Sequence, residues 1–358
     1  MLFRSVSQSR YSTYQTCPWK WYERYIMGLE RSFNGERSSS SRTIGSLFHE
    51  GVASYYTTGT PDISQSVIDT HNASPEAVIT ARTCLERWLR EYALEPPFTT
   101  TYIEQPIRAD IPGELDTIPI LAKIDTYGQA APDTWIYSGD GFNERIYLQP
   151  GYWIIEHKTK SVDLKRHIYS QMWQSNKQAD FQILALQSHL QAPVHGVIVD
   201  VVEKPRNAPP RRKCKGCGAY SDYSAYLPSY DSPGKYVCPL CGHIQGLTPL
   251  GDPRSYTPET YRLVITRTPL QLAEAIRSIE ITYDRMCIIE DRGWDSASRW
   301  ITPTYSSCVH PIYGSCEFFD PHTSGTPAAE SSLLTINPNP LHYTAVVSAA
   351  ATEEPTSV

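Results

Sequence analysis

The stretch Tyr152–Lys160, YWIIEHKTK, joins an apolar, β-branched run to a Glu-x-Lys triplet made by Glu156 and Lys158. Such a run predicts a buried strand, with the acid and the lysine at its end. A second apolar run, Ile118–Ile124, ends in Asp125. If these strands are neighbours, two carboxylates and an ammonium meet at one edge of a sheet. Carboxylate oxygens suit a hard divalent cation and a lysine can orient an attacking water, so the pattern suits metal-dependent hydrolysis of a phosphodiester. From these three residues alone, ordinary charges at strand ends are the simpler explanation.

The periodicity along the rest of the chain predicts a mixed α/β core. Two short helices are expected around Cys17-Pro18 within residues 5–30, because proline interrupts a helix. The segment 129–143 is predicted to be a polar turn. Apolar spacing predicts further helices over 43–56, 75–95, 164–190 and 270–292, and strands near 101–110, 117–128, 145–157, 195–202 and 261–266. This order indicates a sheet core preceded by a helical N-terminal cap.

The composition is that of an ordinary globular protein. Of the 358 residues, 40% are hydrophobic and 20% are charged, which is typical of that class. There is no run of 18 apolar residues that would predict a membrane span, and residues 1–15 lack the apolar core of a signal peptide. We therefore expect a cytoplasmic protein without membrane partners. The segment 322–358 is rich in Pro, Ser, Thr and Ala, which predicts a disordered tail.

The formal net charge of −6 argues against a protein that binds nucleic acid over its whole surface. It leaves room for a local basic groove, which net charge does not report. Lys20, Arg24 and Lys160 are candidates for contact with phosphates, and the aromatic side chains between residues 11 and 25 could stack on the bases of a single strand. Core packing of a short helical cap is the simpler explanation for most of those rings.

Nine cysteines in an apparently cytosolic chain favour metal binding over disulfides. The chain has two Cys-x-x-Cys-Gly motifs, CKGCG at 214–218 and CPLCG at 238–242, and 20 residues lie between the two cysteine pairs. Four thiolates suit a tetrahedral structural zinc site with no open position for catalysis. Residues 206–250 are therefore predicted to be an inserted zinc ribbon held together by its metal, with the ligands Cys214, Cys217, Cys238 and Cys241.

Several motifs, in their order along the chain, resemble the PD-(D/E)xK nuclease superfamily. The resemblance is to its RecB-like exonuclease branch, which includes the CRISPR-adaptation nuclease, AddB-like nuclease domains and phage exonucleases. Residues 7–29, SQSRYSTYQTCPWKWYERYIMGL, are similar to the family's N-terminal segment, and GSLFH at 45–49 is similar to its Gly-x-x-x-His. KIDTYG at 123–128 is similar to Gly-x-Ile-Asp, with Lys123 in place of the glycine. IIEHKTK supplies the Glu-x-Lys triplet.

A last motif, Asp180–Gln182 with Leu186, resembles the family's Gln-x-x-x-Tyr helix, although leucine stands in place of the tyrosine. The resemblance spans roughly residues 5–320 and implies a restriction-endonuclease-like fold. This is a mixed sheet core flanked by helices over 1–320, with the helical cap and the inserted zinc ribbon.

The resemblance also implies the roles of the site residues. His49, Asp125, Glu156 and the backbone carbonyl of His157 would bind Mg²⁺ or Mn²⁺, and Lys158 would stabilise developing charge and orient the nucleophile. Gln182 would position Lys158 or the substrate. From the residue type alone, His49 is more simply explained as a helix-capping or core histidine.

A four-iron–four-sulfur cluster is a further candidate cofactor. Many members of the family hold one through a single N-terminal cysteine and three cysteines near the C-terminus. Cys17 lies in the matching Cys-Pro, and Cys308 and Cys316 resemble the first two of the C-terminal set, but the expected last cysteine is absent. A cluster with an unusual fourth ligand, a lost cluster and plain packing all stay open.

These inferences favour a divalent-metal-dependent DNA nuclease. We expect an exonuclease acting on DNA ends or single strands in phage-type recombination, replication or repair, in the host cytoplasm if a phage encodes it. A recombination or helicase protein is the expected partner. One alternative is a catalytically silent nucleic-acid-binding or adaptor protein with a zinc ribbon on a nuclease fold. A sequence-specific endonuclease is another alternative, although no target-recognition region is visible.

Overall fold

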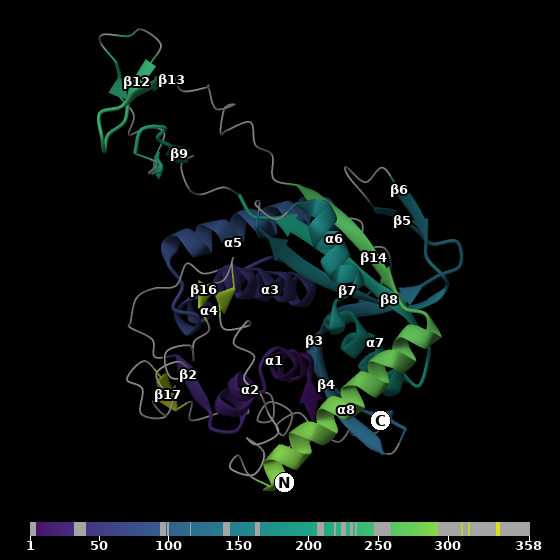
Figure 1. Cartoon of the computed structure of the whole chain (residues 1–358). Coiled ribbons are helices and arrows are strands. Elements are labelled where there is room, and N and C mark those ends of the chain that lie inside the picture. The colour runs from purple at the N-terminus through teal and green to yellow at the C-terminus, as the bar shows by residue number, and fades with distance from the viewer. Residues whose placement is uncertain are drawn as a thin grey trace.

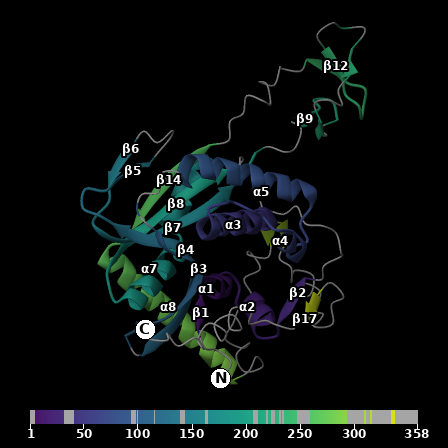
Figure 2. The same cartoon turned by 180° about the vertical axis from the view of Figure 1, so that it is seen from behind.

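A six-stranded mixed sheet forms the centre of the protein (Figures 1 and 2). The computed structural model describes residues 5–31, 41–93, 98, 100–114, 116–138, 144–161, 165–205, 211–217, 220–222, 227–229, 232, 235–246, 259–292, 309–310, 314–315 and 334–336. The sheet consists of β1 (Val6–Ser7), β3 (Thr100–Pro112), β4 (Thr117–Ala130), β7 (Gly151–Lys160), β8 (Val194–Glu203) and β14 (Thr260–Thr266).

The strand β4 meets three partners, and their arrangement leaves a gap. One edge of β4 pairs antiparallel with β3 from Thr117 to Gly128. The other edge pairs with β1 at Ile120 and Leu121, and with β7 only from Thr126 to Ala130. Residues 122–125 of that edge therefore lie between two ladders. Beyond β7 the sheet continues with β8, which is parallel to β7, and with the antiparallel β14.

Helices cover both faces of the sheet. In Figure 1, α3 and α5 lie on one side, and α7 lies on the other with α1 and α8 beside it. The bounds are α1 (Gln8–Thr16), α2 (Pro18–Tyr25), α3 (Ser41–Thr58), α4 (Gln65–Thr70), α5 (Pro75–Trp88), a π-helical turn (Leu89–Ala93), α6 (Arg166–Gln174), α7 (Lys177–Leu190) and α8 (Pro269–Arg292). The predicted mixed α/β core is thus confirmed. None of the helices in the described ranges is long and apolar enough to cross a membrane.

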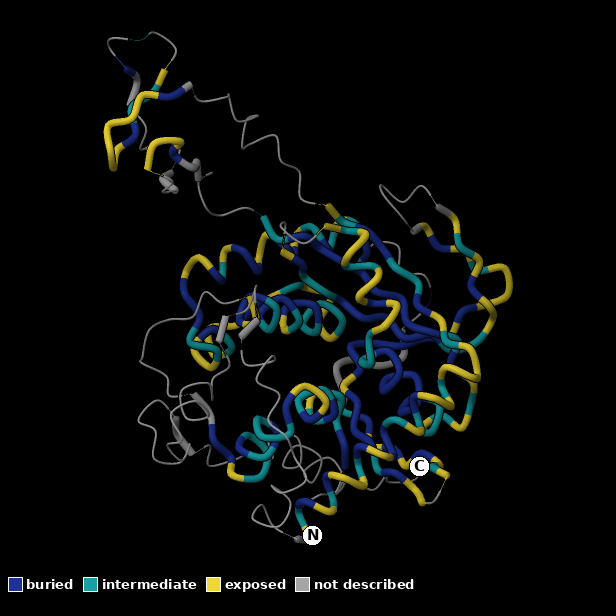
Figure 3. The backbone as a smooth tube through the Cα atoms, viewed as in Figure 1, coloured by how far each residue is buried: buried dark blue, intermediate teal, exposed yellow. Residues whose placement is uncertain are grey.

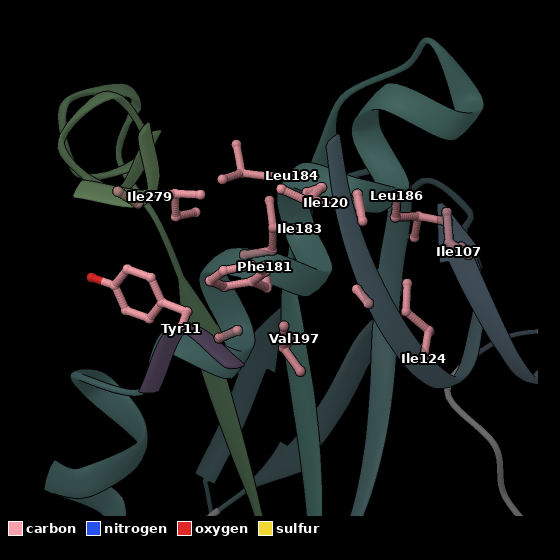
Figure 4. Packing of buried hydrophobic residues seen from close by; sticks show 14 of the residues in the cluster. Tyr11, Ile107, Ile120, Ile124, Phe181, Ile183, Leu184, Leu186, Val197 and Ile279 are labelled. Carbon is pink, nitrogen blue, oxygen red and sulfur yellow. The ribbon is translucent and has the colours of Figure 1, made fainter. Parts of the chain in front are cut away.

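The main core lies between the sheet and α7. Successive side chains of a strand point to opposite faces, so Val197, Val199 and Val201 of β8 face α7, whereas Val202 packs with α3 and α5. Figure 3 shows the strands of the sheet as mostly buried. Figure 4 shows how side chains from α1, α7, α8 and the strands meet, among them Tyr11, Ile120, Ile124, Phe181, Ile183, Leu184 and Ile279. This packing fixes α7 against β4 and β7.

Two predicted elements differ from the structure. The predicted helix 164–190 is interrupted, and α7 starts again after Asn176, whose side chain accepts a hydrogen bond from the Gln178 amide at 2.8 Å. The predicted strand 145–157 is also two elements. Its first part is β6 (Glu144–Tyr147), which pairs with β5 (Trp135–Ser138) as a hairpin, so 129–143 is not merely a polar turn.

Short strands make up the remaining described parts. In the cysteine-rich segment, β9 (Arg211–Lys213) pairs with β10 (Tyr220–Asp222), and β11 (Leu227–Pro228), β12 (Lys235–Val237) and β13 (Ile244–Gly246) form a small sheet. β15 (Val309–His310) pairs with β16 (Gly314–Ser315). Within the predicted tail, Leu334–Ile336 forms β17 and pairs with β2 (Leu29–Arg31). Residues 322–333 and 337–358 lie outside the described residues.

Candidate active site

The two predicted acids lie where β4 and β7 separate. The ladder between these strands ends at the pair Thr126 and Ile155, so Asp125 and Glu156 are the next residues along. Opposite residues of paired strands present their side chains on the same face, and Lys158 follows two residues later on that face. The sequence prediction that two carboxylates and an ammonium meet at one edge is therefore reproduced by the strand register.

His49 reaches the same place from α3. Its Nδ1 lies 3.3 Å from Oδ2 of Asp125. The same carboxylate oxygen accepts a hydrogen bond from the backbone amide of His157 at 2.9 Å. Asp125 thus takes the place of a ladder partner for β7 and at the same time holds the imidazole of His49.

Glu156 is almost fully enclosed, with 1% of its surface exposed. The Lys158 ammonium forms an ion pair with its Oε1. Two amides from α7 complete its surroundings: Gln178 donates to Oε1 at 2.6 Å and Gln182 donates to Oε2 at 2.7 Å. Residues four apart lie on one face of a helix, which explains how both amides reach one carboxylate. Gln182 also donates to the backbone carbonyl of Lys123 at 3.0 Å.

Lys158 is charged at neutral pH. Burial lowers its pKa, but the nearby carboxylates of Glu156 and Asp125 have the larger combined effect, and the pKa is raised above the ordinary value. Its Nζ lies 6.0 Å from the centre of the Trp173 ring. An ammonium held in this way cannot take up a proton, so Lys158 is suited to stabilise negative charge rather than to act as a base.

These side chains open into one cavity of about 500 Å³. Its walls come from the first turn of α1, the N-terminal half of α3, the residue after α4, the strands β4 and β7, and the first turn of α7. The lining residues are Gln8, Ser9, Ser41, Arg42, Gly45, Ser46, His49, Glu50, His71, Lys123, Asp125, Glu156, Lys158, Thr159 and Gln178. Acidic and basic groups therefore share a hollow with room for a phosphodiester group.

Two of the candidate donors, His49 and Asp125, have the spacing of ligands to one hard divalent cation. Ligands of one octahedral cation with bonds of about 2.1 Å lie about 3 Å apart, and the separation of His49 Nδ1 from Asp125 Oδ2 is close to this value at 3.3 Å. The N–H and C=O of a residue in an extended strand point to the same side. Because the His157 N–H points to Asp125, its carbonyl faces that side as well. Gln182 Oε1 is buried and has no hydrogen-bond partner within the described residues, which leaves an acceptor for a water molecule.

The side chain of His157 points away from this site, to the face covered by α3 and α5. The Trp88 indole N–H donates to its Nδ1 at 3.1 Å, and the Tyr56 hydroxyl lies 3.4 Å from its Nε2. Behind it, Asp200 forms a buried ion pair with Arg262. Burial lowers the pKa of His157 to about 4, so the ring is neutral. Because Tyr56 and His49 belong to the same helix, this contact also fixes α3 against β7.

The three residues predicted to contact phosphates lie in different surroundings. Lys160 does not face the cavity: it is buried, and its ammonium donates to Glu203 Oε1 at 2.6 Å, since a buried cation needs a paired carboxylate. Lys20 and Arg24 lie half-buried on α2. Tyr11 and Trp21 are core residues. Core packing, the simpler explanation of the N-terminal aromatic side chains, therefore applies to these two. Cys17 is buried, whereas Cys308 and Cys316 fall outside the described residues.

The four cysteines of the two Cys-x-x-Cys motifs come together, with their sulfurs all within 4.8 Å of one another. Cys214 and Cys241 are 3.6 Å apart, and Cys217 and Cys238 are 4.0 Å apart. Tetrahedral bonds of about 2.3 Å to zinc place sulfurs about 3.8 Å apart. Burial raises the pKa of Cys238, but backbone amides and neighbouring thiols outweigh this and lower it to about 6. In the same cluster, a backbone hydrogen bond from His243 lowers the pKa of Cys241, but desolvation and hydrogen bonds with the other three thiols outweigh this and raise it to about 12. The spacing of the four sulfurs therefore carries the assignment, and it is the geometry of a metal site.

Comparison with known proteins gives one family. The family model of the PD-(D/E)XK nuclease superfamily matches residues 5–109. This range includes His49 and ends before Asp125, and it supports the superfamily and a metal-dependent nuclease. No curated protein sequence matches the chain. The solved structure titled "Crystal structure of SSO0001" is similar over 78% of this chain and 87% of that one, at 9% identity and a TM-score of 0.23. At such values nothing further follows from that likeness.

Sequence reasoning missed two parts of the site. Gln178 contacts Glu156 as directly as Gln182 does, and its position four residues earlier on the same predicted helix was the available signal. The contacts of the His157 side chain with Tyr56 and Trp88 join segments that are far apart in the chain, so no local pattern indicated them.

Removal of either α7 amide tests their support of Glu156. Gln178→Ala and Gln182→Ala each leave the carboxylate without one donor, and outer partners of metal ligands typically contribute about 10–100-fold to metal affinity. We expect each variant to bind Mn²⁺ at least about tenfold more weakly by isothermal titration calorimetry. Gln174→Ala, at an exposed position of α6, is the matched control. Unchanged Mn²⁺ affinity in both site variants contradicts this prediction.

The buried His157 predicts an acid-sensitive fold. Its pKa is about 4 in the folded chain against an ordinary 6.5, so between these values the unfolded chain holds a proton that the folded chain lacks. Stability is therefore full above pH 6.5 and is lost as the pH falls towards 4. By this linkage, urea unfolding should show about 2 kcal/mol less stability at pH 5 than at pH 7.5 from this residue.

His157→Gln is the control for that measurement, since glutamine keeps an acceptor for Trp88 and does not titrate. The variant should lose about 2 kcal/mol of the pH dependence of the unfolding free energy. An identical pH dependence in the wild type and the variant would show that His157 is not the titrating group.

Proposed function

We propose that this protein is a divalent-metal-dependent DNA nuclease that hydrolyses phosphodiester bonds at DNA ends or in single strands. The observation that carries the proposal is the convergence of His49, Asp125, Glu156 and Lys158 in one cavity. The first three residues come from separate parts of the chain, namely α3, β4 and β7. The match of residues 5–109 to the PD-(D/E)XK nuclease superfamily supports the same conclusion.

The cation would be held by His49, Asp125, Glu156 and the backbone carbonyl of His157. Carboxylate and carbonyl oxygens suit Mg²⁺, and the imidazole nitrogen makes Mn²⁺ an equally suitable ion. A cation bound there would supply Lewis-acid polarisation of the scissile phosphate. The donor chemistry and the 3.3 Å separation of His49 from Asp125 favour this assignment.

Lys158 would stabilise the charge that develops on the phosphate. It is an ammonium whose pKa is raised, and a fixed cation in a partly enclosed site stabilises charge more than it would in water. Gln178 and Gln182 would hold Glu156 in one rotamer, so that Lys158 can turn from the carboxylate to the substrate without disordering it. The complete set of side chains argues against the catalytically silent alternative.

An exonuclease of the RecB-like type, with a role in recombination, replication or repair, is the finer form of this proposal. It rests on the motif resemblance, in which the N-terminal segment, Gly-x-x-x-His and Glu-x-Lys occur in the family's order. The four-cysteine cluster is proposed to hold a structural Zn²⁺, because all four positions are filled by sulfur and none is left for a substrate. The iron–sulfur cluster stays a prediction.

Cleavage assays with site variants test the nuclease. With Mg²⁺ or Mn²⁺, the wild type should degrade end-labelled linear DNA and leave closed-circular duplex DNA intact. Glu156→Gln and Lys158→Ala should each lose activity by about 100-fold or more, as the removal of one charge-stabilising group does in other enzymes. Lys165→Ala, an exposed lysine near the site strand, should retain activity. A wild type that is inert on every DNA with both metals would contradict the proposal, and cleavage of circles would replace the exonuclease by an endonuclease.

Metal analysis tests the cysteine cluster. The purified chain should contain one equivalent of zinc by plasma mass spectrometry, because the cluster holds the full ligand set of one tetrahedral site. Cys238→Ser should lose that zinc, whereas Cys287→Ser, on α8 outside the cluster, should keep it. Iron in place of zinc, or zinc that remains bound to Cys238→Ser, would contradict the assignment.

A further inference from the structure

The hairpin formed by β5 and β6 carries an exposed aromatic face. Trp135 pairs with Tyr147, and Tyr137 pairs with Arg145, so these four side chains lie on one side of the hairpin because alternate residues share a face. On the other side, Ile136 is 2% exposed and packs with Trp153 and Ile155 of β7. The fold therefore uses one face of the hairpin and leaves the aromatic face to solvent.

This face differs from the rest of the surface. Trp135, Tyr137 and Tyr147 are 48%, 52% and 43% exposed, and among the residues whose side-chain burial the structure describes no other Phe, Trp or Tyr is exposed. The remaining exposed large hydrophobic side chains are aliphatic and belong to other elements. Single exposed apolar residues need no explanation, but a grouped set marks a contact surface.

The chemistry of the face points to nucleobases rather than to an apolar protein surface. The rings of Trp135 and Tyr147 are 5.4 Å apart, and the Arg145 guanidinium lies 4.9 Å from the centre of the Trp135 ring. No aliphatic side chain lies among the four outward residues. Aromatic rings with an adjacent arginine bind single-stranded nucleic acid by stacking on unpaired bases, while the cation contacts the phosphates.

We propose that Trp135, Tyr137, Arg145 and Tyr147 form a stacking platform for unpaired bases of single-stranded DNA, apart from the catalytic cavity. The proposal rests on the proposed function for the identity of the ligand. The hairpin packs on Trp153 and Ile155 of β7 through Ile136, and Glu156 is the next residue of that strand.

Fluorescence anisotropy in the absence of added Mg²⁺ and Mn²⁺ tests the platform without cleavage. The probes are labelled oligothymidylates of about 20 and about four nucleotides, together with a blunt duplex. Trp135→Ala and Tyr147→Ala should each weaken binding of the long single strand by at least about fivefold, the lower end of what one stacked base contributes. Binding of the duplex should be unchanged, whereas binding of the short probe should also be weakened, because a short single strand can stack on the platform as well. Trp135→Phe keeps a π face and should bind the long strand nearly as the wild type does.

Ile79→Ala is the matched control, because Ile79 is an exposed apolar residue of α5. Wild-type affinity of Trp135→Ala and Tyr147→Ala for the long strand would overturn the platform. Equal losses on single strand and duplex would overturn it as well. A wild type that cleaves duplex DNA but binds no single strand refutes the platform and leaves the nuclease intact, whereas a wild type that neither binds nor cleaves DNA refutes both.

Discussion

The carboxylate of Glu156 is buried away from water. The groups around it offset the free-energy cost of burying this charge. An unpaired buried charge costs several kcal/mol, and here Lys158, Gln178 and Gln182 provide the partners. Two of these partners come from α7, so the carboxylate is stable only when α7 lies against β7. The apolar side of α7 secures this, because Phe181 and its neighbours are packed into the main core. One helix thus serves core packing and the electrostatics of the site.

The second constraint is the gap in the pairing of β4. Backbone groups of a buried strand need hydrogen-bond partners, yet β7 leaves β4 after Ile155. Asp125 closes part of the gap by accepting from the His157 amide. The same departure opens the cavity in which the cation and the phosphodiester would lie. The acid is therefore both a structural partner of the strand and a candidate metal ligand, which explains why it stands at the last residue before the paired segment.

The two faces of β7 have different roles. One face carries residues of the candidate site, and the other holds a helix in position. Glu156 and Lys158 face the cavity, while the His157 side chain lies against Tyr56 and Trp88 on the other face. Because Tyr56 belongs to α3, the contact on the far face restrains the helix that presents His49. A neutral imidazole is suited to this place, since full burial disfavours the charged ring and lowers its pKa.

The sequence by itself determined the strands that carry Asp125 and Glu156, most helices, and the pairing of the two Cys-x-x-Cys motifs. These follow from local periodicity, charge at strand ends and ligand spacing, which act between residues close in the chain. It did not determine the break between α6 and α7, the β5–β6 hairpin, the burial of Lys160 or the surroundings of the His157 side chain. Those features depend on which surfaces meet when distant segments pack. Lys160 shows the reason: its local pattern is that of a solvated basic residue, but the tertiary structure brings Glu203 to it and removes both from water.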